Sequence, residues 1–177
     1  TGACTQILQD PDYSDTQFGD VAWSPDGHLL ASGTYQHGVQ VWEMTALSRR
    51  WVGHAGLTFV RRVAWSPDGS RLASCGDDGS ICLWRASDGM LLQTLHEHSA
   101  RVATVAWSPD GTWLASGGGG RSSGELFLWH SSQGVEPAEY RAVADAAARP
   151  PLRTTQYHQD TRTHPSPESH AVCAGGF

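Results

Sequence analysis

The chain has 177 residues, 39% of them hydrophobic, so it is long enough for one soluble domain with a buried core. Its net charge is −6 and all 12 basic residues are arginines, which argues against nucleic-acid binding and excludes lysine-dependent chemistry. Four cysteines without a CxxC pattern favour reduced thiols and a cytoplasmic location, and no apolar run is long enough to span a membrane, so we expect no membrane contact.

A seven-residue segment, Val-Ala-Trp-Ser-Pro-Asp-Gly, occurs at residues 21–27, 63–69 and 105–111. Successive copies start 42 residues apart, and a second tryptophan closes each repeat, at Trp42, Trp84 and Trp129. A fixed period of this length is typical of one supersecondary unit copied in tandem. Such a unit must stack on its neighbours to bury its apolar face.

Residues 1–10 have the pattern that precedes a later copy of the segment. Residues 1–8 stand before the first Val-Ala-Trp as residues 88–95 stand before the third. The sequence therefore predicts an outer strand left over from a preceding repeat. It also predicts that the chain is a fragment of a longer protein.

Four short strands are expected in each repeat. In residues 88–130 they are the apolar or β-branched stretches 90–95, 102–107, 113–116 and 126–129. The Ser-Pro-Asp-Gly segment is turn chemistry, because proline presets φ and glycine accepts a positive φ. Four strands joined by tight turns predict one antiparallel sheet per repeat, and the chain as a whole is expected to be all-β.

The repeat pattern ends after residue 130, and residues 131–177 are predicted to form a separate tail. The alanine-rich stretch 137–149 starts with a proline and is followed by two more, which favours a short helix. The rest of the tail mixes polar residues with histidine and proline and has few apolar side chains. This composition predicts an irregular or disordered end.

The repeats resemble those of the WD40 family. Gly53-His54 before an inner strand, Leu-Ala-Ser after the turn, and the closing strand at residues 78–84 match its motifs in register. The resemblance implies β-propeller blades at residues 11–52, 53–95 and 96–130, after the remnant strand at 1–10. Three blades share two contacts, whereas a closed ring has one per blade, so the propeller is expected to be incomplete. Its open faces would allow self-association.

The same resemblance implies a hydrogen-bond network inside a blade that joins a histidine, a serine, an aspartate and the closing tryptophan. In the second repeat these residues are His54, Ser74, Asp78 and Trp84. The first repeat has Gln36 at the aspartate position. The third has His98, Ser116 and Trp129 but a Gly/Ser/Arg stretch in place of the aspartate. We expect these two repeats to be less stable for that reason.

No group of residues has a pattern typical of catalysis. The glycine-rich segment 117–124 resembles a phosphate loop, but the chain has no lysine and a strand follows, so a hairpin insert is favoured. Asp77 and Asp78 lack a third metal ligand nearby, and His96 and His98 have no further ligand either. We therefore expect no catalytic residue, no cofactor and no metal. The alternatives are a propeller-based hydrolase or lyase, or a truncated, non-functional remnant.

Cys75 and Cys82 lie in the hairpin around Asp78-Gly79. A two-residue turn would place the two cysteines opposite each other, at a separation that permits a disulfide. A three-residue turn on residues 77–79 would put them out of register. Two packed, free thiols are the favoured interpretation.

One rim of the blades is the expected binding surface. By resemblance, the residues that flank the first valine of the inner strand and the residue before the network aspartate face this rim. These residues are Tyr35, Phe59, Arg61, Asp77 and Arg101. Aromatic and arginine side chains are enriched among the residues that dominate protein interfaces. The predicted function is a non-catalytic protein–protein interaction scaffold or sensor module whose protein partner is unknown.

Overall fold

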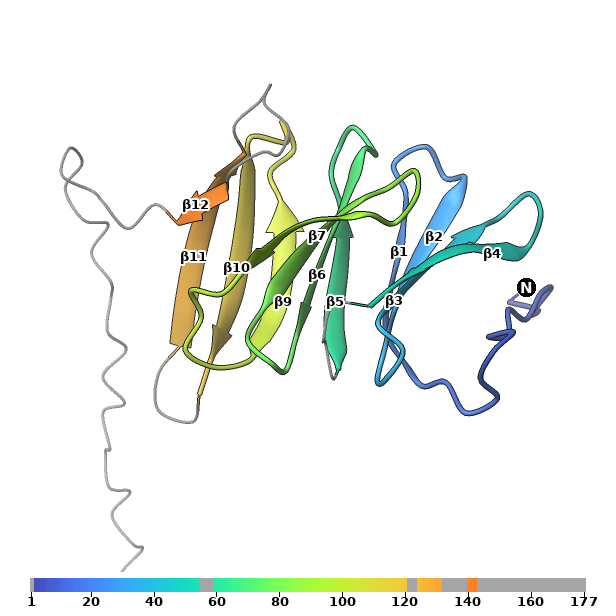
Figure 1. Ribbon diagram of the computed structural model, residues 1–177. Helices are drawn as coiled ribbons and strands as arrows, with labels where there is room; N and C mark the ends of the chain where they lie inside the picture. Colours follow the sequence, from blue (N-terminus) through green and yellow to red (C-terminus); the bar gives the residue numbers. More distant parts are fainter. Residues whose placement is uncertain (1, 55–58, 121–123, 132–139, 143–177) are drawn as a thin grey trace, which may run out of the picture. The chain divides into compact units, whose positions relative to one another are not determined.

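The computed structural model describes residues 2–54, 59–120, 124–131 and 140–142, which belong to one compact unit, residues 1–145. Strands consecutive in sequence pair antiparallel and form three four-stranded sheets, which we call blades 1, 2 and 3 (Figure 1). The all-β prediction is confirmed. Blade 1 contains β1 (Phe18–Trp23), β2 (Leu29–Thr34), β3 (Val39–Glu43) and β4 (Ser48–Gly53); blade 2 contains β5 (Val60–Trp65), β6 (Arg71–Gly76), β7 (Ile81–Arg85) and β8 (Leu91–Leu95); blade 3 contains β9 (Val102–Trp107), β10 (Trp113–Gly119), β11 (Gly124–Ser131) and β12 (Tyr140–Ala142).

Each Ser-Pro-Asp-Gly segment forms the turn between the first two strands of its blade. In blade 3 the Ser108 hydroxyl and the backbone N–H of Thr112 both donate to the Asp110 carboxylate, and Gly111 has a φ of 71°. These hydrogen bonds lower the pKa of Asp110 to about 2. Blades 1 and 2 repeat the arrangement. The turn residues therefore align the first two strands of every blade in the same way.

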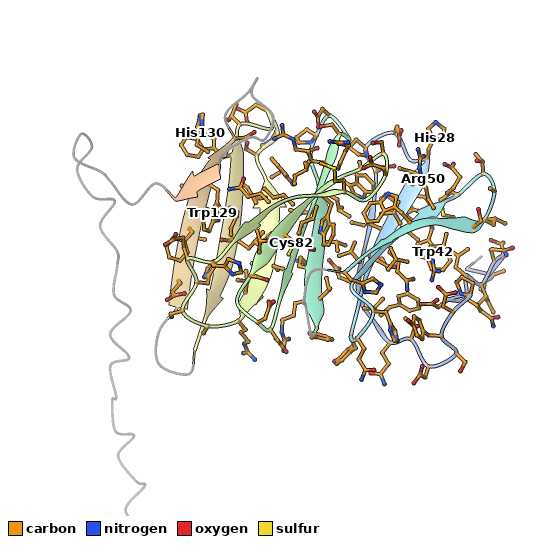
Figure 2. All side chains as sticks on the ribbon, in the orientation of Figure 1. His28, Trp42, Arg50, Cys82, Trp129 and His130 are labelled. Atoms are coloured by element: carbon orange, nitrogen blue, oxygen red, sulfur yellow. The ribbon has the colours of Figure 1, made fainter. Side chains whose placement is uncertain are left out.

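Two apolar cores lie between consecutive blades. Side chains alternate along β7, so Cys82 and Trp84 face blade 1 whereas Ile81 and Leu83 face blade 3. The first core joins Ala31, Val39, Val41 and Trp51 of blade 1 to Val60, Val63, Trp65, Leu72, Cys82 and Trp84 of blade 2. The second joins Ala73, Cys75, Ile81, Leu83 and Leu95 of blade 2 to Val102, Val105, Leu114 and Trp129 of blade 3. Blade 2 is buried on both faces; Figure 2 labels Cys82 within it.

A hydrogen bond repeats at each blade interface. The indole Nε1 of Trp65 donates to the backbone carbonyl of Ala22 at 3.0 Å, and that of Trp107 donates to the carbonyl of Ala64 at 3.2 Å. Trp23 ends the first strand of blade 1, as Trp65 and Trp107 end theirs. The three tryptophans of the repeated segment therefore occupy equivalent places in their blades.

The outer strand predicted for residues 1–10 is wrong where the structure describes it, because residues 2–10 pair with no described strand. Asp10 instead anchors this segment to blade 1. Its buried carboxylate accepts hydrogen bonds from the Gln40 amide, from the Thr16 hydroxyl at 2.9 Å and from Arg49 at 2.8 Å. Burial opposes the ionisation of Asp10, but these partners hold its pKa below the usual value. Side-chain hydrogen bonds to Gln40 and Arg49, not strand pairing, therefore hold this segment against blade 1.

The helix predicted for residues 137–149 is also wrong at its described part. Residues 140–142 form β12, which pairs with β11 through Trp129 opposite Ala142 and Ser131 opposite Tyr140. The outer edge of β11 offers unpaired backbone groups, and a short strand satisfies them where an isolated helix would not. The disorder predicted for the end of the tail falls on residues outside the described part of the chain.

Candidate interaction surface

The predicted network of blade 2 is only half formed. The Trp84 indole donates to the Ser74 hydroxyl at 2.9 Å, and both side chains are buried. His54 is exposed, and no hydrogen bond between described residues joins it to Ser74 or Asp78. The carboxylate of Asp78 is used locally, because it accepts from the backbone N–H of Ser80 at 3.1 Å and from the Ser80 hydroxyl. An aspartate in a tight turn often bonds to the backbone two residues on, which removes it from a longer network.

The complete network is found in blade 3, where the sequence did not predict an acid. The Trp129 indole donates to the Ser116 hydroxyl at 2.8 Å, and Nε2 of His98 lies 2.8 Å from the same oxygen. Nδ1 of His98 lies 3.1 Å from Oε2 of Glu125. Ser99 donates its hydroxyl and its backbone N–H to Glu125, and these bonds with the contact to His98 lower the pKa of that carboxyl. Glu125 therefore orients His98 against Ser116.

Sequence reasoning missed Glu125 because its spacing is different. It stands four residues before Trp129, whereas Asp78 stands six before Trp84. The hairpin of blade 3 is extended: β10 continues to Gly119, and Glu125 pairs with Gly118. The sequence feature that could have identified Glu125 is an acid on the strand that follows the glycine-rich insert. The hairpin interpretation of that insert is confirmed.

Four of the five predicted binding residues form one cluster. The rings of Tyr35 and Phe59 meet edge to face with centroids 3.6 Å apart, and the Arg61 guanidinium lies 4.9 Å from the Phe59 centroid. Arg61 also forms a two-pronged ion pair with Asp77, in which Nη2 and Oδ2 are 3.1 Å apart. We call Tyr35, Phe59, Arg61 and Asp77 the aromatic–arginine cluster. It joins the β2–β3 turn of blade 1 and the β6–β7 turn of blade 2 to the start of β5.

The backbone holds this cluster in place. The N–H of Asp77 donates to the carbonyl of Phe59 at 3.2 Å, and the N–H of Tyr35 donates to the carbonyl of Gln17 at 3.0 Å. Tyr35 is 46% exposed, and the side chains of Arg61 and Asp77 are about one third exposed. The cluster is thus rigid but still presents a surface to solvent.

Arg101, the fifth predicted residue, lies in blade 3 and does not contact the cluster. It lines a shallow hollow of about 520 Å³ with Gly117–Gly119, Glu125 and Leu126. Its carbonyl approaches the hairpin so closely that a Cβ on Gly118 would lie 2.4 Å from it. The glycines therefore allow β10 to pass the loop that carries Arg101.

The family model for the WD40 repeat, described as WD domain, G-beta repeat, matches residues 2–43, 46–85 and 89–130. The chain belongs to the WD40 repeat family. No curated protein matches it significantly. WD40 repeats generally mediate protein–protein interactions.

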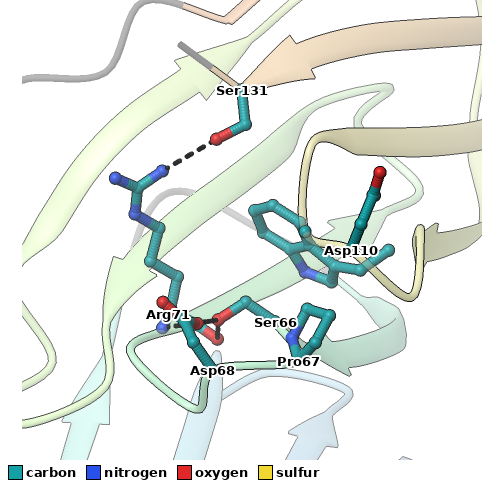
Figure 3. Close-up of a pocket in the computed structure, with 8 residues that line it drawn as sticks. Ser66, Pro67, Asp68, Arg71, Asp110 and Ser131 are labelled. Carbon is teal, nitrogen blue, oxygen red and sulfur yellow. Dashed lines mark hydrogen bonds between the residues drawn. The ribbon is translucent and has the colours of Figure 1, made fainter. Parts of the chain in front are cut away.

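A second hollow, of about 480 Å³, lies between the Ser-Pro-Asp-Gly turns of WD40 blades 2 and 3 (Figure 3). Asp68 and Asp110 line it, and each carboxylate accepts hydrogen bonds from its own turn. The Arg71 guanidinium donates to the Ser131 hydroxyl at 3.3 Å across this hollow. Its polar groups are therefore engaged in holding the turns.

Cys75 and Cys82 are free and buried in the WD40 blade 2. The turn has three residues, so Cys75 pairs with Ile81, and the two thiols lie in different interblade cores. The two-residue turn that would allow a disulfide is wrong. Burial raises the pKa of Cys75 to about 12 and that of Cys82 to about 11, so both thiols stay protonated.

Two other kinds of site are absent from the described ranges. No group of three or more His, Cys, Asp or Glu side chains there is arranged to hold a metal ion. No helix in those ranges is long and apolar enough to cross a membrane.

Proposed function

We propose that this chain is a non-catalytic interaction module that binds a protein partner through the aromatic–arginine cluster. The observation that carries the proposal is the position of Phe59 between the Tyr35 ring and the Arg61 guanidinium, which Asp77 holds in place. Residues that dominate binding are most often Trp, Tyr and Arg. A cluster that is ordered before binding loses little side-chain entropy when a partner arrives.

The chemistry of the cluster favours a particular kind of partner. Arg61 and Asp77 largely cancel each other's charge, so attraction of a strongly charged ligand is not its main feature. Tyr35 offers an exposed ring and a hydroxyl. A protein loop that places an apolar or aromatic side chain against Tyr35, and a carbonyl or carboxylate near Arg61, would satisfy these groups.

The same proposal covers the remaining aspects of function. The chain acts without a cofactor or metal and does not bind nucleic acid or membrane, and its net charge of −6 is consistent with that. The hydrolase or lyase alternative would need carboxylates that converge on a substrate, whereas Asp68 and Asp110 are each held by their own turn. We place the chain in the cytoplasm, where Cys75 and Cys82 stay reduced.

Binding of variants to a partner captured from a cell extract tests the proposal. Phe59→Ala and Arg61→Ala should each weaken binding by roughly 30-fold, which corresponds to about 2 kcal/mol. Arg101→Ala should weaken it only if the partner also covers blade 3. Arg50→Ala is the matched control, because Arg50 is exposed and also pairs with an acid, Glu43, at 3.4 Å.

Melting temperatures of all four variants should equal that of the parent. The proposal fails if Phe59→Ala and Arg61→Ala bind like the parent. It also fails if Arg50→Ala weakens binding as much as they do.

A further inference from the structure

The hollow between the Ser-Pro-Asp-Gly turns of blades 2 and 3, which we call the junction hollow, has a counterpart between blades 1 and 2. Arg71 and Ser131 line the junction hollow. Arg71 stands where Leu29 stands in blade 1, because each precedes the leucine that pairs with the closing tryptophan. Ser131 stands where Ala86 stands in blade 2, because each donates its backbone N–H to the carbonyl of the residue after the turn glycine. The two junctions therefore have matching positions.

A tryptophan fills the space at the first junction. Trp51 of β4 reaches across from blade 1 and donates its indole N–H to the carbonyl of Ala86 at 2.9 Å. It is 9% exposed, and the Leu29 side chain packs against the core to which it belongs. Its ring lies so close to Gly89 that an added Cβ there would be 2.6 Å from it. An indole ring therefore completes the contact between blades 1 and 2.

A glutamine stands at the tryptophan position of the second junction. Gln93 of β8 occupies the register position of Trp51 in β4, opposite the residue before the closing tryptophan. The junction hollow has a volume of about 480 Å³, within the range of roughly 300–1,000 Å³ that is typical of ligand sites. The second junction therefore has an open space at a place where the first has a ring.

The groups around the junction hollow suit an aromatic ring. Trp107 lines it, and the ring of this half-buried side chain is fixed by its hydrogen bond to the Ala64 carbonyl. The Arg71 guanidinium is held by the Ser131 hydroxyl at 3.3 Å, and Figure 3 shows Arg71 and Pro67 on either side of the hollow. Aromatic rings stack on one another and attract a guanidinium to their faces. Trp107 and Arg71 offer both interactions.

We propose that the junction hollow binds the indole ring of a tryptophan side chain from a protein partner. The ring takes the place that Trp51 has at the first junction, and its N–H donates to the Ser131 carbonyl, the counterpart of the Ala86 carbonyl. This site is separate from the aromatic–arginine cluster, because β6 begins at Arg71 beside the hollow and ends at Gly76, next to Asp77 of the cluster. The inference thus goes beyond the proposed function.

An uncharged ring also leaves the polar groups of the junction hollow in their present bonds. Asp68 and Asp110 each stay hydrogen-bonded within their own turns, and Arg71 stays bonded to Ser131. A charged ligand would have to compete with these hydrogen bonds, and an unpaired polar group that becomes buried is costly. The existing bonds therefore favour an indole ring over an anion or a cation.

Titration of the isotope-labelled full chain with N-acetyltryptophanamide, followed by proton–nitrogen correlation spectra, tests the proposal. The indole N–H signal of Trp107 and the Nε–H signal of Arg71 should shift until the site is saturated. N-acetylphenylalaninamide lacks the indole N–H and should bind about five-fold more weakly. Gln93→Trp should fill the hollow from within and weaken probe binding by at least about ten-fold. Gln93→Ala is the matched control, because it adds no ring and should bind like the parent.

The comparison of the two probes on the parent chain decides the proposal should Gln93→Trp fail to fold, which circular dichroism reports. Signals of Trp107 and Arg71 that do not move with N-acetyltryptophanamide overturn the proposal. So does a folded Gln93→Trp variant that binds the probe like the parent, or equal binding of the phenylalanine probe. Free indole that binds more tightly than N-acetyltryptophanamide would overturn the assignment to a protein side chain.

Discussion

Blades 2 and 3 share a serine–tryptophan hydrogen bond but differ in what surrounds it. In blade 2 the Ser74 hydroxyl accepts a hydrogen bond from Trp84, whereas the nearby Asp78 carboxylate accepts one from Ser80 in its own turn. In blade 3 the Ser116 hydroxyl contacts both Trp129 and His98, and Glu125 completes the network. The longer hairpin of blade 3 puts its acid on a strand, not in the turn. Whether a blade forms this hydrogen-bond network therefore depends more on where its acid lies in the folded sheet than on how many residues separate that acid from the closing tryptophan.

Removing the shared hydroxyl should give the largest difference between the two blades. Ser116→Ala leaves two buried partners without a bond and should lower the free energy of unfolding by about 2–3 kcal/mol, whereas Ser74→Ala leaves one and should cost about 1 kcal/mol. Urea denaturation followed by tryptophan fluorescence measures both. Equal losses would show that His98 contributes nothing to blade 3.

Closing the space inside the long hairpin should have the next largest effect. A Cβ on Gly118 would lie 2.4 Å from the Arg101 carbonyl, so Gly118→Ala should destabilise the chain by about 2 kcal/mol. Gly120→Ala is the matched control, because nothing lies within 4 Å of its added Cβ. Thermal melts of the two variants should separate them clearly. A neutral Gly118→Ala would mean that the hairpin and the Arg101 loop move apart easily.

Acid should reveal the role of Glu125. Its pKa is lowered in the folded chain, so its contribution to stability is present above its usual value near 4.5 and is lost as the pH falls below it. Glu125→Gln should therefore reduce stability at pH 7 and flatten the loss of stability below pH 4.5. Asp78→Asn in blade 2 is the comparison variant, and urea midpoints between pH 3 and pH 7 provide the measurement. An unchanged pH profile in Glu125→Gln would contradict this role.

Thiol reactivity should give the smallest but most local signal. In a chain that carries Cys4→Ser and Cys173→Ser, Cys75 and Cys82 should both react with a thiol reagent after unfolding. Both should barely react in the native state, since burial raises the pKa of Cys75 to about 12 and that of Cys82 to about 11. In mild urea Cys82, between blades 1 and 2, should react before Cys75, which lies next to the networked blade 3. Reaction of Cys75 first would reverse the stability order of the two interfaces.

Much of the candidate interaction surface could be predicted because it depends on local position in a repeat. The resemblance to the WD40 family predicts Tyr35, Phe59, Arg61 and Asp77 from their places beside an inner strand and before the network aspartate, and the structure brings them together. Arg101 has the same local position but lies in another blade. Proximity between blades depends on how sheets stack, which residue spacing within one repeat does not contain.

By itself, the sequence determined the regular strands and turns of the three repeats, because alternating apolar residues and Ser-Pro-Asp-Gly turns act over short distances. Only the tertiary structure decided the partners of the isolated acids and of the chain's outer segments. Asp10 binds Gln40 and Arg49, Glu125 binds His98, and residues 140–142 complete blade 3 as a strand. The physical reason is that a hydrogen-bonding group pairs with the nearest available partner, either a buried donor or the free edge of a strand. The distance to that partner is set only when the sheets pack.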